Sequence, residues 1–244
     1  MVDAARGLII AIDGPAGAGK STLASRLARH YGYLNIETGA MYRALALKAI
    51  ENDISVDDGS SLCALAAHSS IKLQPTVDGN RVILDTVDIS NRIREKDVTE
   101  AASRVSVHPE VRAWMVSRQR EMGKQGGVVM EGRDIGTAVF PHADVKIFLD
   151  AAPEVRGNRR YQQTYKSAAA VEAAKPHPGP DAPAVRALAD EMRERDQRDR
   201  TRAISPLIAA SDAITIDSTQ LPFDEVMARA KAAIDARLNP TQSC

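Results

Sequence analysis

Residues 14–22 of the chain, GPAGAGKST, combine three glycines with a lysine and two hydroxyl side chains. The spacing Gly14-x-x-x-x-Gly19-Lys20-Ser21 is typical of a phosphate-binding P-loop. Glycines allow a backbone to wrap around one anion with its N–H groups pointing inward, and a helix that begins at Lys20 would direct its free N–H groups at the same anion. The Lys20 ammonium would add positive charge beside the β- and γ-phosphates, and the Ser21 hydroxyl could ligate Mg²⁺.

We therefore predict that this loop binds the polyphosphate of a nucleoside triphosphate, in preference to a glycine-rich turn without a ligand. The predicted triphosphate-binding residues are Gly14, Pro15, Ala16, Gly17, Ala18, Gly19, Lys20, Ser21 and Thr22. Asp13 directly precedes the loop, where its carboxylate would either contact a Mg²⁺-bound water or cap the end of a strand.

Two further segments place polar side chains directly after strand-like runs. They are residues 37–43, ETGAMYR, with Thr38 and Arg43, and residues 131–134, EGRD, with Arg133 and Asp134. Ligands of open α/β sheets bind outside the carboxyl ends of the strands, so both segments are candidate binding positions. Each segment is equally consistent with a strand-to-helix turn whose charges are solvated.

The charged residues at 191–202, EMRERDQRDRTR, are spaced so that some of them share a helix face with apolar side chains, which favours ligand binding. The apolar side chains of this helix form a stripe through Val185, Leu188 and Met192. The same stripe continues at heptad spacing through Arg195, Asp199 and Arg202. In a regular helix these charged side chains point inward, where an unpaired charge is costly, and a phosphate is a natural partner for guanidinium groups. The alternative is a solvated helix face with i,i+4 ion pairs.

Short apolar runs alternate with helical stretches along most of the chain. The strand-like runs are 8–12, 34–36, 128–130, 145–149 and 213–216. The helical stretches include 20–30, 40–51, 110–123, 153–165, 185–200 and 223–238. This alternation predicts βαβ units, and therefore an α/β fold with a mostly parallel five-stranded sheet between two layers of helices.

Two segments interrupt the alternation. Residues 53–105 contain alternating apolar side chains and an Asp-Gly turn signal at 78–79, which predicts small antiparallel strands. Residues 166–185 are rich in alanine and proline, which is typical of a surface loop or of a lid that closes over a ligand. The helix before this loop carries Arg156, Arg159 and Arg160, and we expect some of them to face the closed site.

The composition excludes several classes of protein. Acidic and basic residues balance at 32 each, which does not favour non-specific nucleic-acid binding. The two cysteines, Cys63 and Cys244, give no disulfide or zinc spacing, and no apolar run approaches the ~20 residues of a membrane span. We see no signal peptide, because the first apolar run ends in a charged glycine-rich loop. We expect a cytoplasmic protein that binds no membrane, and a monomer, because no long exposed apolar stripe is visible.

Motifs that are absent from the chain limit the classes of protein that could use the bound triphosphate. It has no NKxD motif of a switch GTPase and no LSGGQ motif of an ABC protein, so a small kinase is the favoured class. The alternatives are a kinase for another small-molecule acceptor, such as a shikimate- or gluconate-type enzyme, and a module that senses ATP without transferring a phosphoryl group. An RNA-binding protein with a vestigial P-loop is disfavoured by the balanced charge and the few aromatic residues.

Four stretches together carry a specific resemblance. They are IDGPAGAGKST, ETGAMYRALAL, EGRDIGTAVFPHADVKIFLDA and ERDQRDRTRAISPL, and they extend from residue 8 to about residue 217. The chain resembles the bacterial cytidylate kinases of the nucleoside monophosphate kinase group. The resemblance implies transfer of a phosphoryl group from ATP, with Mg²⁺, to CMP or dCMP. It also implies a P-loop core of residues 1–52, 106–156 and 185–244, a monophosphate-binding insert of residues 53–105, and a lid of residues 157–184.

The resemblance also implies roles for individual side chains. Those expected around the monophosphate and sugar are Thr38, Arg43, Arg133, Arg195 and Arg202, with Asp199 accepting from a sugar hydroxyl. Those expected to face the base are Ser103, Arg112 and Asp134. Those expected to stabilise the transferring phosphoryl group are Lys20, Arg133, Arg195 and Arg159, while Arg160 would contact ATP. Cytosine presents an N4 donor and an N3 acceptor, which suit an acceptor such as Asp134 beside a donor such as Arg112, whereas uracil inverts both positions.

Overall fold

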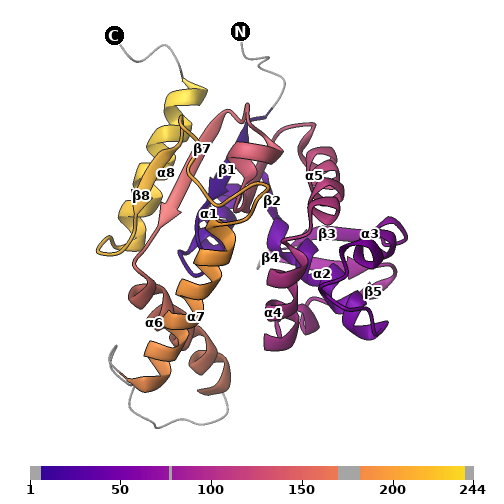
Figure 1. The fold of residues 1–244 in the computed structure, drawn as a ribbon. Helices are drawn as coiled ribbons and strands as arrows, with labels where there is room; N and C mark the ends of the chain where they lie inside the picture. Colours follow the sequence, from indigo (N-terminus) through magenta and orange to yellow (C-terminus); the bar gives the residue numbers. More distant parts are fainter. Residues whose placement is uncertain (1–6, 77–78, 170–181, 240–244) are drawn as a thin grey trace.

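The computed structural model describes residues 7–76, 79–169 and 182–239. Its centre is a five-stranded sheet with the strand order β2-β6-β1-β7-β8 (Figure 1). The strands are β1 (Ile9–Asp13), β2 (Leu34–Glu37), β6 (Val128–Gly132), β7 (Val145–Asp150) and β8 (Ile214–Asp217). Every neighbouring pair in this sheet is parallel, which confirms the predicted α/β fold and its parallel five-stranded sheet.

Helices cover both faces of the sheet, because its central strands are apolar on both sides. All five residues of β1 and of β6 are buried. Ile10 and Ile12 pack with residues of α1 (Lys20–Tyr31) and α8 (Phe223–Leu238). Ile9 and Ala11 face the opposite side, where the π-helix η2 (Ile135–Val139) and part of α5 (Pro109–Gly123) lie. The result is the predicted three-layer arrangement.

The expected antiparallel strands form a separate three-stranded sheet with the order β3-β4-β5. These strands are β3 (Ile71–Thr76), β4 (Gly79–Leu84) and β5 (Val87–Asp88), and both of their pairings are antiparallel. The sequence did not indicate that helices accompany them, namely α3 (Gly59–Ala67), the short η1 (Arg92–Arg94) and α4 (Lys96–Val105). This unit packs on α2 (Thr38–Glu51) through one buried apolar cluster.

Two helices lie side by side below the sheet in Figure 1 and come between β7 and β8 in the chain. They are α6 (Pro153–Ala169) and α7 (Pro183–Arg200). A Cβ atom on Gly157 of α6 would lie 2.9 Å from the backbone nitrogen of Ala189 in α7, so the close approach requires glycine. Residues 170–181, most of the predicted lid loop, are outside the described residues. In the part of the chain that the structure describes, no helix is long and apolar enough to cross a membrane.

Candidate functional site

The P-loop joins β1 to α1 in the predicted strand–loop–helix order. Gly14, Gly17 and Gly19 have φ angles of 146°, 77° and 98°, a region that side chains disfavour. A Cβ atom on Gly14 would lie 1.9 Å from the carbonyl oxygen of Leu149 in β7, so no larger residue fits. The glycines thus allow the loop to wrap tightly against the edge of the sheet where the parallel strands end.

Lys20, the first residue of α1, is buried at the centre of this loop. Its Nζ donates to the carbonyl oxygen of Pro15 at 2.7 Å. Burial, together with repulsion from Arg133, lowers the pKa of Lys20 to about 7, although Glu131 and Asp13 act in the opposite direction. An anionic ligand at this position would therefore stabilise the charged form of the ammonium group.

Ser21 and Glu131 form the contact that links α1 to the end of β6. The Ser21 hydroxyl donates to Glu131 Oε1 at 2.6 Å, and burial raises the pKa of the Glu131 carboxyl. A hydroxyl and a carboxylate are hard oxygen ligands, so this pair fits Mg²⁺. Glu131 is not among the predicted site residues, although its place at the end of a predicted buried strand is a signal from which the sequence could have indicated it.

Thr38 and Arg43 lie at the start of α2, on the same side of the sheet end. Thr38 Oγ1 donates to the carbonyl oxygen of Glu131 at 2.8 Å. The Arg43 guanidinium pairs with Glu37, and its Nε is buried without a hydrogen-bond partner among the described residues. Thr38 therefore contacts the segment 131–134 directly, while Arg43 is held by Glu37 at the end of the neighbouring strand β2.

The inward phase predicted for α7 is confirmed by its ion pairs. Asp199 accepts a hydrogen bond from Arg133 Nε at 2.8 Å and lies 3.7 Å from the guanidinium of Arg202. Burial lowers the pKa of Arg195 to about 10, and the neighbouring charge of Arg133 adds to this effect. The cluster at the end of β6 thus combines Arg195 and Asp199 of α7 with Arg202, which lies just beyond this helix, and with Arg133. Its three guanidinium groups and one carboxylate leave an excess of positive charge.

Two of the three residues expected to face a base, Arg112 and Asp134, are in direct contact. Arg112 of α5 forms a buried ion pair with Asp134 and donates to the carbonyl oxygen of Ser106 at 3.1 Å. The guanidinium carbon of Arg112 lies 5.9 Å from the ring centroid of Tyr42. The Ser103 hydroxyl is buried and has no hydrogen-bond partner among the described residues. An acceptor, a donor and an unsatisfied hydroxyl therefore come from three different elements.

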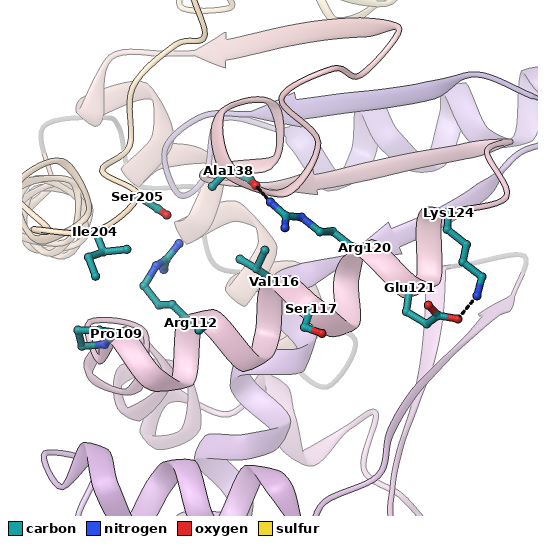
Figure 2. Close-up of a pocket in the computed structure, with 11 residues that line it drawn as sticks. Pro109, Arg112, Val116, Ser117, Arg120, Glu121, Lys124, Ala138, Ile204 and Ser205 are labelled. Atoms are coloured by element: carbon teal, nitrogen blue, oxygen red, sulfur yellow. Dashed lines mark hydrogen bonds and ion pairs between the residues drawn. The ribbon is translucent and has the colours of Figure 1, made fainter.

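A hollow of about 620 Å³ lies along α5, and the Arg112 side chain that projects from this helix forms part of its lining (Figure 2). Figure 2 shows Arg112 pointing from α5 toward the loop that carries Ile204 and Ser205. Arg120 closes another part of the wall by donating to the carbonyl oxygens of Val139 and Ala138. Of the predicted site residues, Arg112 alone lines this hollow within the described chain.

The arginines of α6 occupy different positions from one another. Arg156 is almost fully buried, donates to the carbonyl oxygen of Ala16 at 3.0 Å and pairs with Asp196 of α7 at 2.5 Å. Arg159 donates to the backbone oxygen of Ser218 at 2.7 Å and to its hydroxyl at 3.0 Å, beside the P-loop. Arg160 is half-buried on the same helix. Arg156, which the predicted set of site residues omits, therefore touches the P-loop directly.

The contacts of Asp13 favour its role as a cap at the end of a strand over contact with a Mg²⁺-bound water. Its two carboxylate oxygens accept hydrogen bonds from the backbone N–H groups of Ile135 and Gly136, at 2.8 and 2.7 Å. Burial raises the pKa of Asp13 to about 6. The contact anchors the turn that directly follows Arg133 and Asp134.

Comparison with known proteins identifies the family of this chain. Residues 10–236 match the family described as "Cytidylate kinase". The cytidylate kinase of Solibacter usitatus is 48% identical over 90% of this chain and 88% of its own length. That of a Geobacillus strain is 44% identical over 94% of this chain and 97% of its own. A gluconokinase structure from Sinorhizobium meliloti is 14% identical over 97% of this chain and 95% of its own, with a TM-score of 0.44. The chain belongs to the cytidylate kinase family.

Proposed function

We propose that the protein transfers the γ-phosphoryl group of ATP to CMP and dCMP, forming ADP and CDP or dCDP. The observation that carries the proposal is the contact pattern of residues 131–134. Glu131 contacts Ser21 of the P-loop helix, Arg133 contacts Asp199 of α7, and Asp134 contacts Arg112 of α5. Four consecutive residues therefore join a triphosphate-binding loop to a cluster of side chains suited to a nucleoside monophosphate.

The proposed reaction requires no general base. The second pKa of the acceptor phosphate is about 6, so its attacking oxygen is already anionic at neutral pH. That oxygen forms a bond to the γ-phosphorus while the bond to the β–γ bridging oxygen breaks, and ADP leaves with the electron pair. Catalysis then consists of positioning and of stabilising negative charge, in the roles assigned to Lys20, Arg133 and Arg195.

Mg²⁺ bound with ATP would neutralise charge on the β- and γ-phosphates. Ser21 is the proposed ligand, and Glu131 would hold it or a metal-bound water through its carboxylate. The proposed role of Arg159 requires its guanidinium to leave Ser218 and turn to the phosphates, and Arg160 is the proposed second ATP contact on this helix. These two roles and the lid boundaries stay predictions.

The proposed base site favours cytosine for a physical reason. Asp134 accepts hydrogen bonds and Arg112 donates them, side by side, which matches the N4 donor and N3 acceptor of cytosine. Uracil would place an acceptor opposite the carboxylate and a donor opposite the guanidinium. Each such mismatch costs roughly 1–3 kcal/mol when the group is buried. The orphan Ser103 hydroxyl supplies a third polar contact in the proposal.

The test is ADP release from Mg-ATP with CMP, dCMP, UMP, AMP, GMP, dTMP or shikimate, against a blank without acceptor. We expect fast turnover with CMP and dCMP, slow turnover with UMP, and none with the others. Turnover with a different acceptor would retain a P-loop kinase and reject the roles of Ser103, Arg112 and Asp134. ATP binding without transfer to any acceptor would instead support the sensing module. A cytoplasmic location and a monomeric state complete the proposal.

A further inference from the structure

The carboxylate of Asp13 closes the turn that carries Arg133 and Asp134, a contact to which the proposed reaction assigns no part. Asp13 is the last residue of β1, and only 5% of its surface is exposed. Its Oδ1 accepts a hydrogen bond from the backbone N–H of Ile135 at 2.8 Å, and its Oδ2 accepts one from that of Gly136 at 2.7 Å. Hydrogen bonds to an ionised acceptor are about twice as strong as those between neutral groups, so this contact holds the turn firmly.

The same residue of β1 also fixes the start of this turn. Gly132, the last residue of β6, is the partner of Asp13 in the parallel pairing of the two strands. The backbone is therefore held by the sheet at Gly132 and by the carboxylate at residues 135–136. The two residues between these points are Arg133 and Asp134, the proposed contacts to the acceptor phosphate and base. Asp13 thus limits how far the backbone under both side chains can move.

The packing around Gly136 leaves the turn little freedom. A Cβ atom on Gly136 would lie 3.1 Å from Cδ of Lys146 and 3.4 Å from Oδ2 of Asp13. Lys146 is itself buried, and its Nζ donates to the carbonyl oxygen of Pro141 at 2.6 Å. Ile135 is fully buried in the apolar cluster on this side of the sheet. Because the turn is packed this closely, a change in the length or in the hydrogen bonding of the side chain at position 13 must displace it.

The P-loop begins at the next residue, Gly14, so Asp13 joins the two halves of the proposed site. We propose that Asp13 is a positioning residue, whose carboxylate holds Arg133 and Asp134 at a fixed place relative to the triphosphate-binding loop. The inference rests on the proposed transfer of a phosphoryl group to CMP. A misplacement of about 1 Å among groups that position a substrate can lower turnover about a hundredfold. Both the rate and the choice of base therefore depend on this contact.

Two substitutions at position 13 separate the effect of position from that of charge. Asp13→Asn keeps one acceptor oxygen but turns an NH₂ group toward the second backbone N–H. Asp13→Glu keeps the carboxylate, and with it the negative charge that acts on Lys20, but is one methylene longer. We expect each variant to lower kcat with CMP about tenfold or more and to narrow the CMP-over-UMP ratio of kcat/KM about threefold or more. The KM for ATP should stay close to that of the wild type.

Asp144→Asn is the matched control. The Asp144 carboxylate accepts a hydrogen bond from the backbone N–H of Ile9 at 2.8 Å, at the opposite end of β1 from Asp13. The control variant thus weakens the same kind of contact to the same strand, away from the proposed site. It should lower the urea midpoint of unfolding and leave both kcat and the CMP-over-UMP ratio unchanged.

Gly136→Ala tests the same contact from the side of the turn, should a variant at position 13 fail to fold. The added methyl group would crowd Lys146, so the turn must shift while the carboxylate of Asp13 stays in place. We expect a narrowed CMP-over-UMP ratio in this variant too, with the KM for ATP again unchanged. A role of Asp13 in stability alone would not move this ratio.

Three outcomes would overturn the inference. The first is a wild-type CMP-over-UMP ratio in the folded variants of Asp13 and Gly136, which would leave Asp13 a structural cap only. The second is a loss of activity in Asp13→Asn with wild-type behaviour in Asp13→Glu, since the charge near Lys20 would then matter rather than the position of the turn. The third is a raised KM for ATP with an unchanged KM for CMP, since Asp13 would then act on the P-loop.

The wild type tests the proposed function, whereas the variants test this inference. If the wild type transfers to no acceptor, the proposed function fails. The ratio of the dissociation constants for CMP and UMP, measured by calorimetry, then replaces the ratio of kcat/KM. A narrowed ratio in the variants of Asp13, but not in Asp144→Asn, would still support the positioning role.

Discussion

Two buried side chains, Lys20 at the start of α1 and Glu131 at the end of β6, determine the charge of this site. Lys20 and Glu131 are both buried, and burial moves the pKa of each toward its neutral form. Burial thus opposes the charged form of both groups in the free protein. A phosphate ligand would restore the charged state of Lys20, because an opposite charge favours it.

Replacing Lys20 by alanine tests the proposed P-loop role. We expect Lys20→Ala to lower kcat by about two to three orders of magnitude, as for other preorganised charge-stabilising groups. Because the side chain contributes one hydrogen bond, to Pro15, the fold should survive. Steady-state ADP release measures the first effect, and an unchanged far-UV circular dichroism spectrum is the control. Near-normal turnover would contradict the role.

The depressed pKa of Lys20 predicts a pH effect on ATP binding. In the free protein this pKa is about 7, so at higher pH the amine is mostly neutral, and bound phosphates would raise the pKa again. Binding of Mg-ATP at about pH 8 should therefore take up a proton, and this uptake should vanish well below the free-state pKa. Calorimetry in two buffers of different ionisation enthalpy measures it. Identical heats in both buffers at the higher pH would reject the prediction.

Asp134 tests base selection. We expect Asp134→Ala to narrow the ratio of kcat/KM for CMP over UMP by about tenfold, because the variant no longer discriminates at N4. Asp134→Ala and Asp134→Asn both leave Arg112 without its carboxylate partner, but asparagine keeps an acceptor oxygen in a side chain of the same shape, so comparing the two variants separates the loss of the ion pair from the loss of the contact at N4. A ratio that stays at its wild-type value in the alanine variant would reject the role.

At the scale of elements, the guanidinium group of Arg156 joins both α6 and α7 to the P-loop. Arg156 contacts the carbonyl oxygens of Ala16 and Ala151 and the carboxylate of Asp196. Asp196 directly follows Arg195, which points to the proposed acceptor site. The geometry of the phosphate-binding loop and that of the acceptor helix therefore depend on the same buried contact.

Breaking this contact should destabilise the fold. Arg156→Met leaves the Asp196 carboxylate buried without a partner, and removing one member of a buried pair costs about 3–5 kcal/mol. Urea unfolding measures the loss. The double variant Arg156→Met, Asp196→Leu should recover part of the stability, because it removes the unpaired charge. A single variant as stable as the wild type would show that the pair contributes nothing.

At the scale of the whole molecule, the antiparallel unit and the parallel sheet share their helices. Met41, Leu45 and Leu47 of α2 are fully buried against the cluster that includes Leu62 of α3 and Val98 of α4. The unit that follows α2 therefore covers apolar surface that would otherwise face water.

This shared cluster predicts a single cooperative unfolding transition. Trp114, the only tryptophan, packs against the shared cluster, so its fluorescence reports on the junction, while far-UV circular dichroism reports on all helices. We expect the two signals to give the same urea midpoint. Two separate midpoints would show that the antiparallel unit unfolds independently of the sheet.

Local spacing was enough to predict the P-loop, the five parallel strands and the inward phase of Arg195, Asp199 and Arg202. Those features depend on the periodicity of neighbouring residues, which the sequence contains. The contacts of Ser21 with Glu131, of Asp13 with Ile135 and of Arg156 with Asp196 span 110, 122 and 40 residues. They exist because β6 and β7 lie on either side of β1 and because α6 packs on α7, and neither arrangement follows from spacing along the chain. Strand order and helix packing are properties of the folded chain, so only the tertiary structure determines which charges meet and which stay unpaired.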